Sequence, residues 1–90
     1  MPAAFAIKIG DRLALLTLWR EAISAYTSAC ELAPEAVEAL IRRAQAYESI
    51  KDTKRARQDL NAAVERDPAS PKAWTERGLF AINLVSSPGS

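Results

Sequence analysis

Apolar residues recur along this chain at intervals of three and four residues, the spacing that places side chains on one face of an α-helix. In the first segment Ile9, Leu13 and Leu16 form such a stripe, which predicts a helix over residues 3–16. No segment shows the sustained alternation of apolar and polar residues that is typical of a half-buried strand. The pattern therefore predicts an all-α protein.

Proline and capping residues divide the rest of the chain. Proline lacks an amide hydrogen and clashes with the preceding helical turn, so Pro34 and Pro68 are expected to end two helices. Asp52 or Thr53 is expected to cap the helix before Pro68, and Ser70 the one that follows it, with Pro71 in the first turn. These signals predict four further helices, over 18–33, 35–50, 53 to the residue before Pro68, and 71–84.

The same side-chain sizes return after a step of about 34 residues, the length of a two-helix repeat. The matching positions are Gly10, Ala44 and Gly78, then Ala22 and Ala56, Tyr26 and Leu60, Ala29 and Ala63, Glu31 and Glu65, and Pro34 and Pro68. Glycine inside a helix is unfavourable by about 1 kcal/mol relative to alanine, so Gly10 suggests a helix that crosses too closely for a side chain. The pattern predicts antiparallel helix pairs that stack on one another.

These residues resemble the tetratricopeptide repeat. The best match is RRAQAYESIKDTKRARQDLNAAVERDP, and Trp74 with Gly78 resembles the opening of another unit. Ala6 and Leu40 depart from the family's opening tryptophan, and the turn at Thr17 and Leu18 departs from its glycine and polar residue. The resemblance implies a short right-handed α-solenoid of about five helices. The expected division is one domain over 1–85, made of repeats 3–36 and 37–70 and a half repeat or capping helix 71–85, followed by a flexible tail over 86–90.

Composition argues against catalysis, metal binding and nucleic-acid binding. Twelve basic and eleven acidic residues leave a net charge of +1, too little to attract a polyanion. The chain has no histidine and one cysteine, Cys30, which lies beside Ala29 and is expected to act as a small core residue. No glycine-rich phosphate loop or spaced metal-ligand cluster occurs. We expect a protein that is not an enzyme and needs no cofactor.

The apolar run 13–19 is too short to span a membrane and is followed by Arg20 and Glu21. No small-residue cleavage site follows it. We therefore expect no membrane insertion and a cytoplasmic location.

In the family, the first helix of each pair lines a groove that holds a partner peptide or helix, and the resemblance implies the same here. The implied groove residues are Lys8, Asp11, Glu38, Ile41, Arg42, Gln45, Lys72, Glu76, Leu79 and Asn83. Some members hold the acidic carboxyl ends of chaperones through a clamp of lysine, asparagine and arginine. Only Lys72 agrees with that clamp, whereas Ile7, Asp11, Arg42 and Glu76 depart from it. We expect no binding of acidic chaperone tails, because Asp11 and Glu76 would repel a carboxylate.

Two functions remain open. One is an adaptor or scaffold that binds a partner peptide in the groove. The other is an assembly module, which is either part of a longer array or self-associates through the fifth or the first helix, because about three units are normally needed for a stable stack. Substituting Arg42 and Leu79 with alanine should weaken an adaptor and leave an assembly module intact.

Overall fold

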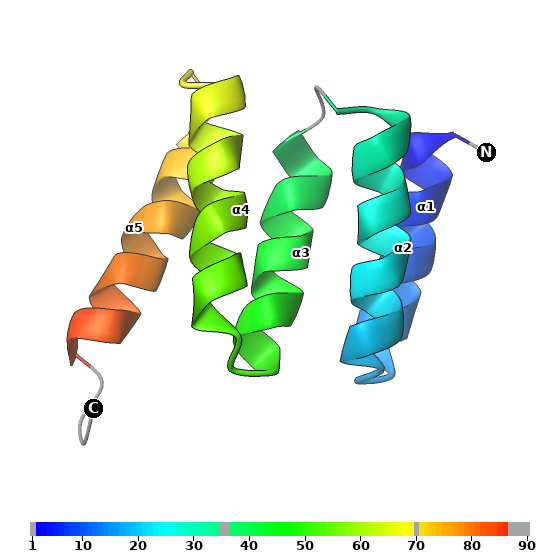
Figure 1. The fold of residues 1–90 in the computed structure, drawn as a ribbon, viewed down its shortest axis with the longest axis horizontal. Coiled ribbons are helices and arrows are strands. Elements are labelled where there is room, and N and C mark those ends of the chain that lie inside the picture. Colours follow the sequence, from blue (N-terminus) through cyan, green and yellow to red (C-terminus); the bar gives the residue numbers. More distant parts are fainter. Residues whose placement is uncertain (1, 35–36, 70, 87–90) are drawn as a thin grey trace.

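The computed structural model describes residues 2–34, 37–69 and 71–86, with side chains through Leu79. Within these ranges it contains helices and no strands, which confirms the predicted all-α class. The helices are α1 (Ala3–Leu15), α2 (Trp19–Leu32), α3 (Val37–Ser49), α4 (Thr53–Arg66) and α5 (Pro71–Ser86). They stand side by side in chain order, with α1 at one end of the row and α5 at the other (Figure 1).

The ends of α2 and α4 and the start of α4 lie close to the predicted proline and capping residues. Helices α2 and α4 end two residues before Pro34 and Pro68. Asp52 caps α4, because its side chain accepts a hydrogen bond from the Arg55 amide at 3.3 Å. Helix α5 ends at Ser86, two residues beyond the predicted helix end at residue 84 and within the predicted tail. The predicted cap Ser70, the predicted start of the third helix at 35–36 and the rest of the tail lie outside the described residues.

The turns inside the two complete helix pairs share one backbone conformation. Thr17 and Lys51, which occupy the same place in successive repeats, have positive φ angles of 57° and 66°. The amide of the next residue then donates to a carbonyl five residues earlier, from Leu18 to Leu13 at 2.9 Å. This is the hydrogen bond of a Schellman helix end, which usually uses glycine at the left-handed position. The turn therefore forms here without the glycine that is usual in the family.

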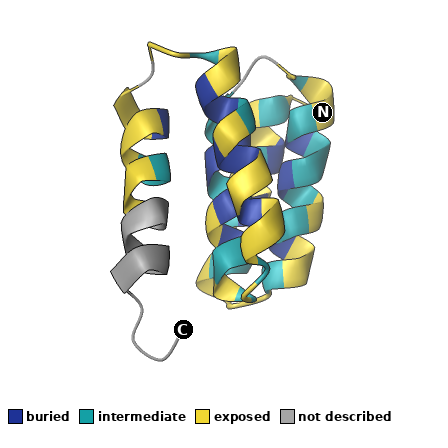
Figure 2. Ribbon diagram, turned by 60° about the vertical axis from the view of Figure 1, so that its left-hand side comes forward, coloured by how far each residue is buried: buried dark blue, intermediate teal, exposed yellow. Residues whose placement is uncertain are grey.

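Buried positions lie on the sides of the helices that face one another, as Figure 2 shows. The core is rich in alanine, and its largest fully buried side chains are Ile41 and Leu60. The extents of 42 × 31 × 17 Å describe a slab about two helices thick. Alanine permits the close helix contacts that the repeat pattern predicted.

The two glycines that share a repeat position have different surroundings. A Cβ atom built on Gly10 would lie 2.4 Å from Cε1 of Tyr26, which confirms the predicted close approach. A Cβ atom on Gly78 would meet nothing within 4 Å among the described atoms.

Opposite effects on stability are therefore expected from the two glycine-to-alanine substitutions. Gly10→Ala should lower the free energy of unfolding by about 1 to 3 kcal/mol, because the Tyr26 ring is held by a 2.6 Å hydrogen bond to Asp11 and cannot yield easily. Gly78→Ala should raise it by about 0.5 to 1 kcal/mol through helix propensity alone. Urea denaturation followed by circular dichroism measures both, and an increase for Gly10→Ala would contradict the packing described.

Candidate peptide-binding groove

Four charged residues from three helices form a continuous row, which we call the charge ladder. Arg42 on α3 contacts Asp11 on α1 at 3.1 Å and Glu38 on its own helix at 2.6 Å. Glu38 in turn contacts Lys72 on α5 at 3.1 Å. The ladder therefore links α1, α3 and α5, the first helices of the successive repeats, and each charge in it faces an opposite charge.

The pKa shifts agree with this pairing. Burial acts to raise the pKa of Glu38, but hydrogen bonds from Lys72 and Arg42 outweigh it and hold the pKa below its ordinary value. Burial likewise acts to lower the pKa of Arg42, but the hydrogen bond and charge of Glu38 raise it above its ordinary value. Tyr26, buried and donating to Asp11, has a strongly raised pKa because of that burial and of the Asp11 carboxylate. Glu38 and Arg42 thus stay charged at neutral pH.

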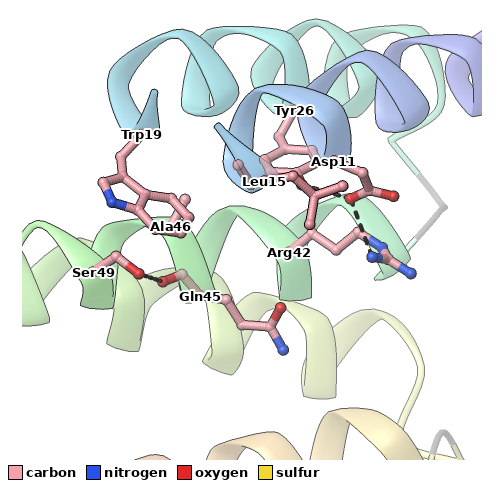
Figure 3. Close-up of a pocket in the computed structure, with 9 residues that line it drawn as sticks. Asp11, Leu15, Trp19, Tyr26, Arg42, Gln45, Ala46 and Ser49 are labelled. Atoms are coloured by element: carbon pink, nitrogen blue, oxygen red, sulfur yellow. Dashed lines mark hydrogen bonds and ion pairs between the residues drawn. The ribbon is translucent and has the colours of Figure 1, made fainter. Parts of the chain in front are cut away.

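A pocket of about 410 Å³ lies beside the ladder, between the first helix pair and α3. Its lining residues are Asp11, Ala14, Leu15, Trp19, Tyr26, Arg42, Gln45, Ala46 and Ser49. Figure 3 shows Trp19 extending toward α3, where Ala46 and Ser49 lie, with Asp11 and Arg42 at the other side of the pocket. The Leu15 side chain belongs to this lining although the residue is 80% exposed. The pocket therefore joins an apolar part to a charged part.

The structure brings together five of the predicted groove residues. Asp11, Glu38, Arg42 and Lys72 form the ladder, and Gln45 lines the pocket.

Ile41, which the resemblance placed in the groove, is buried in the core instead. It is 0% exposed and packs in a cluster with Leu40, Ala63, Val64 and Ala73. Helices α4 and α5 close over this position, so a partner cannot reach it.

The remaining predicted residues are dispersed. Lys8 is exposed and lines a separate depression on α1, and Leu79 is 51% exposed on α5. Glu76 is partly buried and lies near Glu48, whose pKa is raised by burial and by the charge of Glu76. The side chain of Asn83 lies outside the described residues.

Sequence reasoning missed the pocket residues Leu15, Trp19 and Ser49. A signal was present in the run LLTLW, because its leucines are more numerous than one helical stripe requires. Leu15, Leu16 and Leu18 are 80%, 60% and 43% exposed at the end of the first helix pair. Apolar residues gathered at an exposed turn often mark an interaction surface.

Within the described residues, no group of three or more histidine, cysteine, aspartate or glutamate side chains is arranged to hold a metal ion. None of the described helices is both long enough and apolar enough to cross a membrane.

Comparisons with known proteins agree with this architecture. A model of the tetratricopeptide repeat family matches residues 37–80. A comparison with curated proteins gave no match. Among solved structures, the chain is similar to the first tetratricopeptide domain of Spaghetti (RPAP3) bound to the HSP90 peptide SRMEEVD, with 28% identity and a TM-score of 0.83 over 91% of this chain and 65% of that one.

Two further structures have the same fold. The tetratricopeptide domain of Sgt2 from Aspergillus fumigatus has 28% identity and a TM-score of 0.84 over 92% of this chain and 55% of that chain. The second tetratricopeptide domain of Spaghetti, bound to the same peptide, has 24% identity and a TM-score of 0.83 over 94% of this chain and 79% of that chain. The chain thus spans less than two thirds of the length of the first two.

Gly10 approaches Tyr26 in the first helix pair, and Ala44 and Leu60, one repeat later, share one core cluster, so the sequence repeat corresponds to a repeated contact between helices. The family match agrees with that pattern over residues 37–80, and the structural neighbours agree with it over 91% and 92% of the chain. This chain therefore has the tetratricopeptide-repeat fold, and its five helices fit about two and a half repeats.

Proposed function

We propose that this chain is a non-catalytic interaction module that binds a peptide or helix of a partner protein along α1, α3 and α5. The pocket beside Trp19 is the observation that carries this proposal. Its volume of about 410 Å³ suits one large apolar side chain, which Leu15 and Trp19 would contact. The adjoining ladder would bind polar groups of the same segment and set its orientation.

The charge ladder argues against an acidic carboxyl end as the ligand. The structures of Spaghetti hold the peptide SRMEEVD, which is rich in carboxylates. In this chain Asp11 and Glu38 already contact Arg42, and Glu38 also contacts Lys72. A carboxylate from a ligand would have to displace them and would meet their negative charges. We therefore expect a partner segment that presents an apolar side chain without a cluster of acidic residues.

Peptide selection from a displayed random library, followed by calorimetric titration, tests this function. Leu15→Asn should weaken a selected peptide about tenfold or more, because an apolar contact at the pocket is lost. The residue is 80% exposed, so the fold should be unaffected. The matched control is Leu32→Asn, a leucine on α2 that is 48% exposed and does not line the pocket.

The peptide SRMEEVD serves as the negative probe. Micromolar binding of SRMEEVD, or equal loss of a selected peptide in Leu15→Asn and Leu32→Asn, would contradict the proposed site.

An assembly function is the alternative, and one observation favours it. Among the described atoms nothing lies within 4 Å of a Cβ built on Gly78, and Leu79 and Trp74 on the same helix are 51% and 47% exposed. Such a face suits a further helix. Leu79 lies on this face and does not line the pocket, so its substitution tests assembly and not groove binding, contrary to the expectation from the sequence. In sedimentation, an assembly should dissociate in Leu79→Asp and be unaffected by Leu15→Asn.

A further inference from the structure

The outer side of α1 carries an apolar depression of about 350 Å³ that is separate from the groove. Phe5, Ile9 and Leu13 form its apolar lining, and Lys8 and Arg12 line it as well. Phe5 and Ile9 are 54% and 37% exposed, so the apolar lining of the depression is accessible to solvent. Helix α1 stands at one end of the row of helices (Figure 1), and Leu13 at the base of the depression also packs against Ala22, Tyr26 and Ala46.

The corresponding side of α3, the first helix of the second repeat, packs against α2. One step along, Phe5 corresponds to Ala39 and Arg12 to Ala46, which are 0% and 1% exposed. Ala39 packs with Ala29, and Ala46 packs with Ala22 and Tyr26, all on α2. This side of a first helix is therefore the side that contacts a preceding helix, and on α3 alanine allows that contact to be close.

On the corresponding side of α1, Phe5 and Arg12 replace the two alanines of α3. A helix that approached α1 as closely as α2 approaches α3 would clash with the Phe5 ring and would bury the Arg12 charge. A helix can lie there only farther out, with apolar side chains between Phe5, Ile9 and Leu13 and with its polar edge beside Lys8 and Arg12. Phe5 and Arg12 thus favour a helix that packs farther from α1 than α2 packs from α3 and that carries acidic residues beside Lys8 and Arg12.

The positive charges of Lys8 and Arg12 favour a partner with acidic residues. The acidic residue of α1, Asp11, is engaged on the groove side by Tyr26 and Arg42. Lys8 and Arg12 therefore give the outer side a positive potential. A second copy of the chain docked through the same side would bring like charges together, which disfavours self-association through α1. Two basic residues are also fewer than the clusters of about four to eight that bind an anionic membrane surface.

We propose that the outer side of α1 binds an amphipathic helix of another protein, whose apolar residues fill the depression and whose glutamate or aspartate residues pair with Lys8 and Arg12. This surface is distinct from the groove and does not depend on the proposed peptide binding there.

A designed helical peptide tests the proposal. The probe carries leucines at i, i+4 and i+7 and glutamates along one flank, is held helical by a lactam bridge, and is labelled for fluorescence anisotropy. Binding to the full chain should fall about tenfold or more in Arg12→Glu, and in Ile9→Asn. Arg57→Glu, an exposed arginine on α4, is the matched control and should bind as the native chain does.

A charge-swapped probe gives the sharpest outcome. A peptide with lysine in place of each glutamate should bind the double variant Lys8→Glu/Arg12→Glu more tightly than it binds the native chain. Leu15→Asn should leave binding of the first probe unchanged, so a failure of the groove proposal and a failure of this one are distinguishable.

Three results would overturn the proposal. They are equal binding of the acidic probe by native chain and Arg12→Glu, binding of phosphatidylserine vesicles without binding of the probe, and a native dimer that Ile9→Asn dissociates. The first would remove the charge match, and the others would assign the surface to a membrane or to a second copy.

Discussion

Replacing Asp59 with alanine is expected to lower the free energy of unfolding by about 3 kcal/mol, because it leaves the Arg43 guanidinium inside the protein without its counter-charge. Arg43 donates from Nε and Nη2 to the two carboxylate oxygens of Asp59, at 2.8 and 2.7 Å. The two side chains are only 18% and 9% exposed. The hydrogen bonds to Asp59 raise the pKa of Arg43 despite its burial, so Arg43 stays charged.

The pair also holds three helices together. Arg43 on α3 binds Asp59 on α4, and its Nη1 donates to the Thr27 hydroxyl on α2 at 3.1 Å. The guanidinium carbon lies 5.9 Å from the centre of the Tyr47 ring, within reach of a cation–π contact. Loss of Asp59 is thus expected to weaken the contact between the two repeats as well as the second helix pair.

Denaturation with guanidinium chloride measures the free energy of unfolding of Asp59→Ala and of the native chain. The matched control is Glu65→Ala, an exposed acidic residue on the same helix, which should change stability by about 0.5 kcal/mol or less. The double variant Arg43→Met/Asp59→Met should be more stable than Asp59→Ala, since neither charge then remains buried. Equal stability of Asp59→Ala and Glu65→Ala would show that this ion pair contributes little.

Replacing Ile41 with alanine is expected to lower the free energy of unfolding by about 3 kcal/mol and to leave the groove chemistry unchanged. Ile41 is one of the two largest fully buried side chains and packs with Leu40, Val64 and Ala73. Truncating a buried isoleucine removes apolar contacts and leaves a cavity, which typically destabilises a protein by about 2 to 5 kcal/mol. Alanine-rich surroundings cannot move inward to fill the space.

Leu79→Ala is the matched control, because it removes a similar volume from a side chain that is 51% exposed. It should change stability by about 0.5 kcal/mol or less. Thermal unfolding and peptide titration of the folded fraction together test the prediction. A native-like melting temperature for Ile41→Ala, with weakened peptide binding, would restore Ile41 as a groove residue.

Much of the fold could be predicted because its signals are local. Proline ends a helix through its own backbone, so Pro34 and Pro68 mark the ends of α2 and α4. Asp52 caps α4 through an amide only three residues away. The small residue at Gly10 required a close neighbour, although the pattern did not identify the Tyr26 ring as that neighbour. The equivalent Gly78 has nothing within 4 Å among the described atoms, which repeat matching could not foresee.

The candidate site was predicted less completely. Asp11, Glu38, Arg42 and Lys72 were expected in the groove, but their pairing with one another was not. That pairing depends on the distances between α1, α3 and α5, and helical spacing within one segment carries no such information. Leu15 and Trp19 were missed because their importance comes from the position of α3 opposite the first helix pair.

The sequence by itself determined five helices, their ends and the repeat that pairs them, since side-chain size, proline and capping act over a few residues. The tertiary structure alone decided which of the predicted groove residues are buried and which pair with one another. It placed Ile41 in the core, joined four charges into a ladder and left Phe5 and Ile9 on an open side of α1. Burial and charge pairing depend on how close separate helices approach, and that distance is set by the packing of the whole stack.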